Sequence, residues 1–260
     1  MATGRRKRGG WLRRVVGAVT VVVVVPLAGS VASVLGQDLD WRTAPRYSIG
    51  IAPDPRLVRE PVVQVYVARA FGLRGAFGVH SWIAVKRRDA PSFTVFEVIG
   101  WRVLHSQSAV SRSHRAPDGL WFGNRPDLLV DLRGDAVEGV IDRIEKAVDS
   151  YPYAARYTIW PGPNSNTFTA FVARAVPELK VDLPPTAIGK DYLPFGAVFA
   201  RAPSGTGWQV SLFGLLGVLV AADEGIEFNV LGLDFGVDFA QPTLRLPGLG
   251  RIELTGRKGA

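Results

Sequence analysis

Three short runs rich in β-branched residues follow one another with only turns between them, and they restrict the fold more than any other feature. The runs cover residues 62–70 (VVQVYVARA), 79–86 (VHSWIAVK) and 93–99 (FTVFEVI). Alternating, β-branched segments of this length are typical of strands. The glycine-containing turn at 72–78 and the Ala90-Pro91 turn are too short for the crossover that parallel strands need. The sequence therefore predicts an antiparallel sheet.

Two helices are expected after the sheet. Residues 135–150 repeat apolar side chains at helical spacing with charges between them, which predicts an amphipathic helix packed on the sheet. A second helix begins in the segment 160–168 (WPGPNSNTF), because Phe168, Phe171 and Val172 follow at i, i+3 and i+4 spacing and Pro177 ends the pattern. The predicted fold class is α+β, an antiparallel sheet packed against helices.

An uncharged run of 21 residues, 15–35, follows a basic cluster near the amino terminus. About 20 apolar residues suffice to cross a membrane, and basic residues stay on the cytoplasmic side. We therefore expect one transmembrane helix, with the body of the protein periplasmic at the bacterial inner membrane. The alternative is secretion after signal cleavage, because Ser30-Val31-Ala32 resembles a cleavage site.

The chain divides into four predicted parts. Residues 1–36 are the anchor or signal segment, 37–60 a proline-punctuated linker, 61–200 the α+β core and 201–255 a C-terminal β extension. Glycine-spaced apolar runs recur in the extension, as SLFGL at 211–215 and NVLGL at 229–233. We expect a long β-hairpin that covers the sheet, although its Leu and Val side chains could also lie against lipid.

Charge and composition exclude several classes of function. Six basic residues before position 15 account for most of the net charge of +8, which leaves +2 on the rest of the chain. A near-neutral body does not fit a nucleic-acid groove. The chain has no cysteine and three histidines, so we expect no disulfide, no thiolate nucleophile, no metal site and no cofactor.

The residues with catalytic potential lie on the second and third strands and at the start of the second helix. If the strands containing His80 and Glu97 pair, these two side chains can sit side by side, which would orient the imidazole. Asn164 and Ser165 stand where unpaired backbone N–H groups favour an oxyanion. The competing interpretation is that Asn164 or Ser165 simply caps the helix.

Long motifs in order make the chain resemble the uncharacterised bacterial family catalogued as domain of unknown function 3750. The motifs span residues 61–251 and read RGAFGVHSWIAVK, WFGNRPDLLVDLRG, YPYAARYTIWPGPNSNTF, LPPTAIGKDYL, APSGTGWQVSLFGLLG and TLRLPGLGR. This resemblance carries no activity with it.

A second, more distant resemblance is to circularly permuted papain-like proteins, including NlpC-like and lecithin-retinol-acyltransferase-like hydrolases. It implies a permuted papain-like core in which His80 is the base and Glu97 the orienting residue. Residues 164–168 (NSNTF) match the helix start, with Ser165 in place of the cysteine nucleophile. A serine hydroxyl, unlike a thiol, needs contact with the base to lose its proton.

Two functions follow from these residues. In the first, the chain is a serine hydrolase or acyltransferase: Ser165 attacks an ester or amide, His80 is general base and Glu97 orients it. In the second, it is an inactive papain-like module that binds an envelope peptide, glycan or lipid. Asn164, Trp160 and Trp82 are the residues expected to contact such a ligand.

Overall fold

The structure is a computed structural model of the whole chain, and it describes residues 40–254 together with positions 10, 13, 14, 17, 24, 27–32, 34 and 35. Most of the predicted membrane segment, residues 15–35, therefore lies outside the described residues, although 27–32 are helical. None of the helices formed by described residues is long and apolar enough to cross a membrane.

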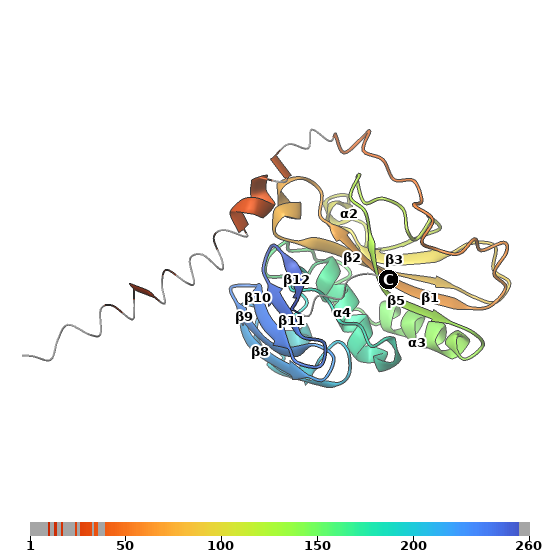
Figure 1. Cartoon of the computed structure of the whole chain (residues 1–260). Helices are drawn as coiled ribbons and strands as arrows, with labels where there is room; N and C mark the ends of the chain where they lie inside the picture. Colours follow the sequence, from red (N-terminus) through yellow and green to blue (C-terminus); the bar gives the residue numbers. More distant parts are fainter. Residues whose placement is uncertain are drawn as a thin grey trace, which may run out of the picture.

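The predicted antiparallel sheet is confirmed and has five strands. Its order is β4 (Val110–Ser113), β3 (Thr94–Val98), β2 (Val79–Lys86), β1 (Val62–Arg69) and β5 (Asp127–Arg133). All four pairings are antiparallel. Each turn joins neighbouring strands from β1 to β4, whereas β5 returns to the free edge of β1. The sheet is thus a meander with one strand added at its other side (Figure 1).

Both predicted helices lie on one face of this sheet (Figure 1). Helix α3 (Val137–Asp149) buries its apolar stripe, and α4 (Ser165–Ala175) packs along β2 and β3. Shorter helical turns occur at η1 (Gly72–Ala76), α2 (Gly100–Leu104), η2 (Pro177–Leu179) and η3 (Pro194–Gly196). The larger hydrophobic core therefore forms between the sheet and these two helices.

Side chains on β2 alternate between two separate cores. Ile83 and Val85 belong to the core shared with the helices, whereas Trp82 and Ala84 belong to a smaller core on the other face. Successive strand residues point to opposite faces, so this division fixes the direction of every side chain on β2. The smaller core is closed by Ile51 and Val58 from the predicted linker and by Trp121.

The C-terminal extension is a second sheet of seven strands. Its consecutive antiparallel strands are β6 (Phe199–Arg201), β7 (Gly207–Leu212), β8 (Leu216–Ala221), β9 (Gly225–Val230), β10 (Leu233–Asp238), β11 (Thr243–Leu246) and β12 (Gly250–Glu253). The expected single long hairpin is wrong in extent. Gly214 and Gly232 have φ of +70° and +78°, so the glycine spacing marks separate tight turns.

The second sheet packs beside α4 (Figure 1). Arg174 on α4 donates from Nε to the Arg201 carbonyl oxygen of β6 at 2.9 Å, and its Nη2 contacts Gln209 on β7. Burial lowers the pKa of Arg174 to about 10. Helix α4 is therefore held between the two sheets.

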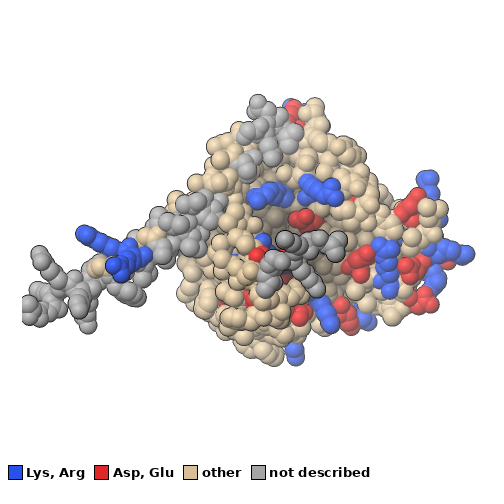
Figure 2. All heavy atoms as spheres, viewed as in Figure 1, with Lys and Arg blue, Asp and Glu red and all other residues tan. Residues whose placement is uncertain are grey.

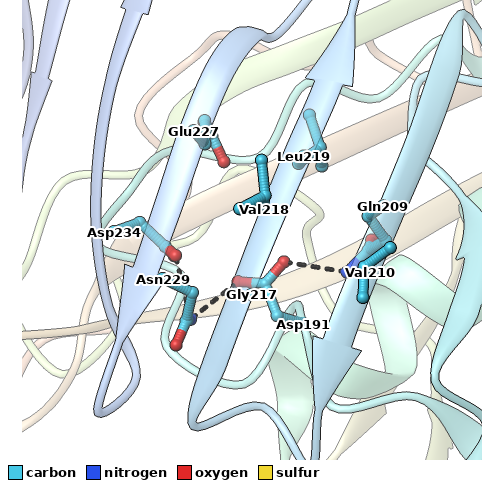
Figure 3. A pocket seen from close by; sticks show the side chains of 9 residues that line it. All are labelled: Asp191, Gln209, Val210, Gly217, Val218, Leu219, Glu227, Asn229 and Asp234. Atoms are coloured by element: carbon cyan, nitrogen blue, oxygen red, sulfur yellow. Dashed lines mark hydrogen bonds between the residues drawn. The ribbon is translucent and has the colours of Figure 1, made fainter.

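A buried charge cluster fills the side of the second sheet that faces the protein. Lys190 Nζ lies 2.6 Å from Glu227 Oε2 and 3.2 Å from Asp191 Oδ2. Asn229 bridges Asp191 and Asp234, and Figure 3 shows these side chains pointing toward one another. Burial opposes the charge of Lys190, but the surrounding carboxylates hold its pKa well above the usual value.

Candidate functional site

Helix α4 begins with a complete capping box. Asn164 Oδ1 accepts from the backbone N–H groups of Asn166 and Thr167 at 3.0 and 3.1 Å, and Thr167 Oγ1 accepts from the Asn164 N–H at 3.1 Å. Asn164 is thus the N-cap, as one of the two sequence interpretations predicted. The carboxamide is fully engaged, because Nδ2 also donates to the carbonyl oxygens of Ile159 and Ile188.

Gly189 is packed directly against this cap. It has φ of +96°, and a Cβ there would lie 2.4 Å from Asn164 Nδ2. Its carbonyl oxygen accepts from Thr167 Oγ1 at 2.7 Å. The loop preceding β6 therefore closes over the helix start and fixes the cap, which leaves Asn164 no free polar atom for a ligand.

Ser165, the predicted nucleophile, is buried at the first position of α4. Its carbonyl oxygen accepts from Ser81 Oγ at 3.2 Å, and that hydroxyl also lies 2.8 Å from Thr169 Oγ1. The hydroxyl of Ser165 makes no hydrogen bond with any residue in the described part of the chain. The β2 side chain that contacts the helix start is thus that of Ser81, and the backbone carbonyl oxygen of Val79 accepts from Asn166 Nδ2 at 3.0 Å.

His80 and Glu97 form the predicted pair. His80 Nε2 lies 2.8 Å from Glu97 Oε2, and both side chains are buried. The imidazole stacks on the ring of Trp121, with ring centres 3.8 Å apart and planes 10° apart. Arg115 holds the other side of Glu97 through contacts of 3.3 and 3.4 Å. The prediction that these two residues meet on one face of the sheet is confirmed.

The charges of this pair follow from burial and from Arg115. Burial lowers the pKa of His80 below its usual value, against the opposing effect of Glu97. Burial alone would raise the pKa of Glu97, but the His80 hydrogen bond and the Arg115 charge lower it to about 2. At neutral pH a neutral imidazole therefore donates Nε2–H to a carboxylate, which leaves Nδ1 as an acceptor.

The structure does not bring His80 to Ser165. Ser81 points to the face of the sheet covered by α4, so its neighbour His80 points to the opposite face, where it stacks with Trp82 and Trp121. The alternation of β2 places Ser81 on the same face as Ile83 and Val85, but because both faces of β2 carry apolar residues, the sequence does not show which face α4 covers. The roles assigned to Ser165, His80 and Glu97 stay a prediction. In the structure His80 and Glu97 form a pair, and Ser165 lies apart from them.

The two tryptophans expected to contact a ligand are both engaged elsewhere. Trp82 is fully buried, and its Nε1–H donates to the Pro117 carbonyl oxygen at 2.7 Å. Trp160 is half exposed and donates to the Leu231 carbonyl oxygen at 2.9 Å, at the turn between β9 and β10. Trp82 is therefore a core residue, and Trp160 joins the helix start to the second sheet.

A cleft of about 380 Å³ that the sequence reasoning missed lies beside Arg115. One wall comes from residues 52–55 of the predicted linker and the other from residues 114–118, with Phe93 between them. The linker is fixed there because Asp118 accepts from Ser48 Oγ at 2.8 Å and from the Ile51 N–H at 2.7 Å. Proline spacing alone gave no indication that this segment packs.

Metal binding has no support in residues 40–254 or in the described positions before them, where no group of three or more His, Asp or Glu side chains could hold an ion. Lys190 and Arg245 occupy the spaces between the clustered carboxylates of the second sheet.

The first prediction concerns the protonation of His80. Below about pH 6.5 an unfolded histidine binds a proton that the buried ring resists, so this residue costs stability as the pH falls through that value. NMR titration of the His80 Cε1–H signal should give a midpoint below 6.5. Glu97→Gln should lower it further, because Glu97 is the group that raises the pKa of His80. A midpoint above 6.5, or an upward shift in the variant, would contradict this electrostatic account.

Comparison with known proteins gives a family without an activity. A sequence model of the family described as protein of unknown function (DUF3750) matches residues 60–192, which is half of the chain and includes the first sheet, both helices and the His80–Glu97 pair. No curated protein and no solved structure matches the chain. The chain therefore belongs to the DUF3750 family of proteins of unknown function.

Proposed function

We propose that this chain is a papain-like module without hydrolase activity, which binds a short zwitterionic peptide of the bacterial envelope. The observation that carries the first half of the proposal is the contact of Ser81, rather than His80, with the start of α4. In the permuted papain-like arrangement the base must face the helix start. Here a hydroxyl group takes that place, and the imidazole is turned to the other face of the sheet.

In this geometry no residue in the described part of the chain is placed as a base for Ser165. A serine hydroxyl loses its proton to a base within about 2.6–3.2 Å, or slightly farther without substrate. Ser81 cannot serve, because a neutral hydroxyl is no stronger a base than the nucleophile itself. The Asn164 cap also takes up the N–H groups of Asn166 and Thr167, so these donors are not free to stabilise an oxyanion.

The charges around the cleft support the second half of the proposal. His114 and Arg115 lie in one wall, and Asp54 lies in the other. Arg115 is paired with Glu97, and the exposed His114 beside it contacts the Phe93 carbonyl oxygen through Nδ1 at 3.3 Å. A ligand with a carboxylate toward His114 and an amino group toward Asp54 would match both walls, while Phe93 and the prolines offer apolar contact. A short peptide with free termini has this chemistry.

Fluorophosphonate labelling tests the absence of hydrolase activity. The wild-type chain and the Ser165→Ala variant should both stay unlabelled under conditions that label a serine hydrolase added to the same sample, because no base activates the hydroxyl. Labelling of the wild type that disappears in Ser165→Ala would instead support the serine hydrolase or acyltransferase.

Peptide binding is measured by calorimetric titration of the full chain with a dipeptide or tripeptide that has free termini. We expect His114→Ala and Asp54→Ala to weaken binding by roughly tenfold each, the effect of losing one charge-assisted hydrogen bond. His105→Ala is the matched control, since His105 is exposed at the end of α2 and does not line the cleft. Equal affinity in all three variants, or no heat of binding in the wild type, would contradict the proposed ligand.

A further inference from the structure

The second sheet has an apolar outer face. Its strand residues alternate between buried positions directed toward the protein and exposed or half-exposed positions directed outward. The outward positions of β6 to β12 are apolar with the exception of Arg201 and Gly250. The exposed or half-exposed apolar residues among them are Phe199, Trp208, Val210, Leu212, Leu216, Val218, Val220, Ile226, Phe228, Val230, Leu233, Phe235, Val237, Leu244 and Ile252.

Strand register places these side chains in continuous rows. Directly paired residues of antiparallel strands share a face. One row runs across six strands, through Trp208, Val220, Ile226, Val237, Leu244 and Ile252. A second row runs through Phe199, Val210, Val218, Phe228 and Phe235. The outward apolar side chains therefore form one continuous surface.

The second sheet packs its polar face inward and directs its apolar face outward. Glu227 and Arg245 are almost fully buried on the inner face, joined at 2.9 Å, while Phe228 next to Glu227 is 52% exposed. Turning the sheet over would remove the ion pairs of Lys190 with Glu227 on β9 and Asp234 on β10. The buried charges thus hold the apolar side chains outward.

The hairpin ends continue the same pattern. Phe213, Leu231 and Phe239 are 63%, 63% and 72% exposed at the turns. Phe213 and Leu231 both have φ of +54°, a conformation that bulky residues rarely adopt and that glycine or asparagine would take more easily. Large apolar side chains are therefore kept at solvent-facing turns in spite of an unfavourable backbone.

The charge distribution agrees with this description. In the view of Figure 2, charged side chains gather over α3 and its neighbouring strands, whereas the surface over β8 to β12 is mostly uncharged. Arg201, the one charged residue among the outward positions, lies at the edge strand β6 with its guanidinium 4.6 Å from the centre of the Trp208 ring. Tryptophan and arginine together are suited to the boundary between lipid and water.

A contact with the amino-terminal segment indicates what covers this face. Ser30 Oγ donates to the Gly248 carbonyl oxygen at 2.9 Å, and Leu27 lies against Gly248, in the turn between β11 and β12. Ser30 and Leu27 belong to the uncharged run of 21 residues behind the basic cluster. The segment with the composition of a membrane anchor therefore meets the protein at the edge of the apolar sheet.

We propose that the outer face of the second sheet lies against a lipid bilayer, so that the chain is held at the membrane by this sheet as well as by its amino-terminal segment. Apolar side chains of a surface-bound element gain from entering the boundary between headgroups and acyl chains. The proposal does not depend on peptide binding, since the cleft belongs to the first sheet and the predicted linker.

Single cysteine labels test this placement, because the natural chain has no cysteine. Full-length Val218→Cys and Phe228→Cys carry an environment-sensitive fluorophore and are reconstituted into vesicles of phosphatidylethanolamine and phosphatidylglycerol. Leu104→Cys is the control, an apolar residue on α2 that is 84% exposed. All three variants retain the amino-terminal segment, so differences between them report the position of the sheet.

Lipids with a nitroxide in the acyl chain should quench the labels at 218 and 228 and shift their emission to the blue, while the label at 104 keeps its emission in water. Equal, weak quenching at all three positions would overturn the proposal. Disulfide-linked dimers formed through Val218→Cys in the same vesicles, without lipid quenching, would overturn it in favour of a second copy of the chain. Circular dichroism of each variant verifies that the labelled chain is folded.

Discussion

The two-residue period of strand β2 is the constraint on which the interpretation of this protein depends. Ser81 is hydrogen-bonded to the start of α4, and the next position along a strand must point away from it. His80 is therefore on the other face, where Trp121 stacks on it and Glu97 accepts a hydrogen bond from its Nε2–H. A difference of one residue along β2 therefore decides whether an imidazole or a hydroxyl group faces the start of α4.

The same two-residue period explains why the second sheet has one polar and one apolar face. Glu227, Asn229 and their neighbours on one side of β9 join the network around Lys190, and Phe228 and Val230 on the other side are exposed. In the first sheet both faces are apolar, because helices cover one and the linker covers the other. A sheet with a charged inner face has to leave its apolar face for another partner, and the adjacent amino-terminal segment makes lipid the consistent choice.

Local sequence patterns predicted much of the fold. The three strands, both helices and the meeting of His80 with Glu97 followed from alternation, helical spacing and short turns. These features depend on residues close in sequence, so propensity and period determine them. The capping interpretation of Asn164 was also available from the sequence, since a threonine three positions later can complete the box.

Other features depend on contacts that a single sequence does not display. The parity of Ser81 and His80 relative to α4 needed the identity of the covered face, and apolar residues on both faces of β2 concealed it. The proline-rich segment before β1 is fixed by Asp118, almost 70 residues later. The second sheet exceeded the predicted hairpin because its inner positions are polar, which made its strands look like interrupted apolar runs.

Disulfide trapping measures the central claim directly, because every cysteine in such a variant is introduced. Ser81→Cys combined with Thr169→Cys should form a disulfide readily under mild oxidation, since the two hydroxyl oxygens that the sulfurs replace are 2.8 Å apart. His80→Cys combined with Ser165→Cys should remain reduced, because these side chains point to opposite faces of the sheet. Rapid bond formation between positions 80 and 165, with none between 81 and 169, would contradict the account.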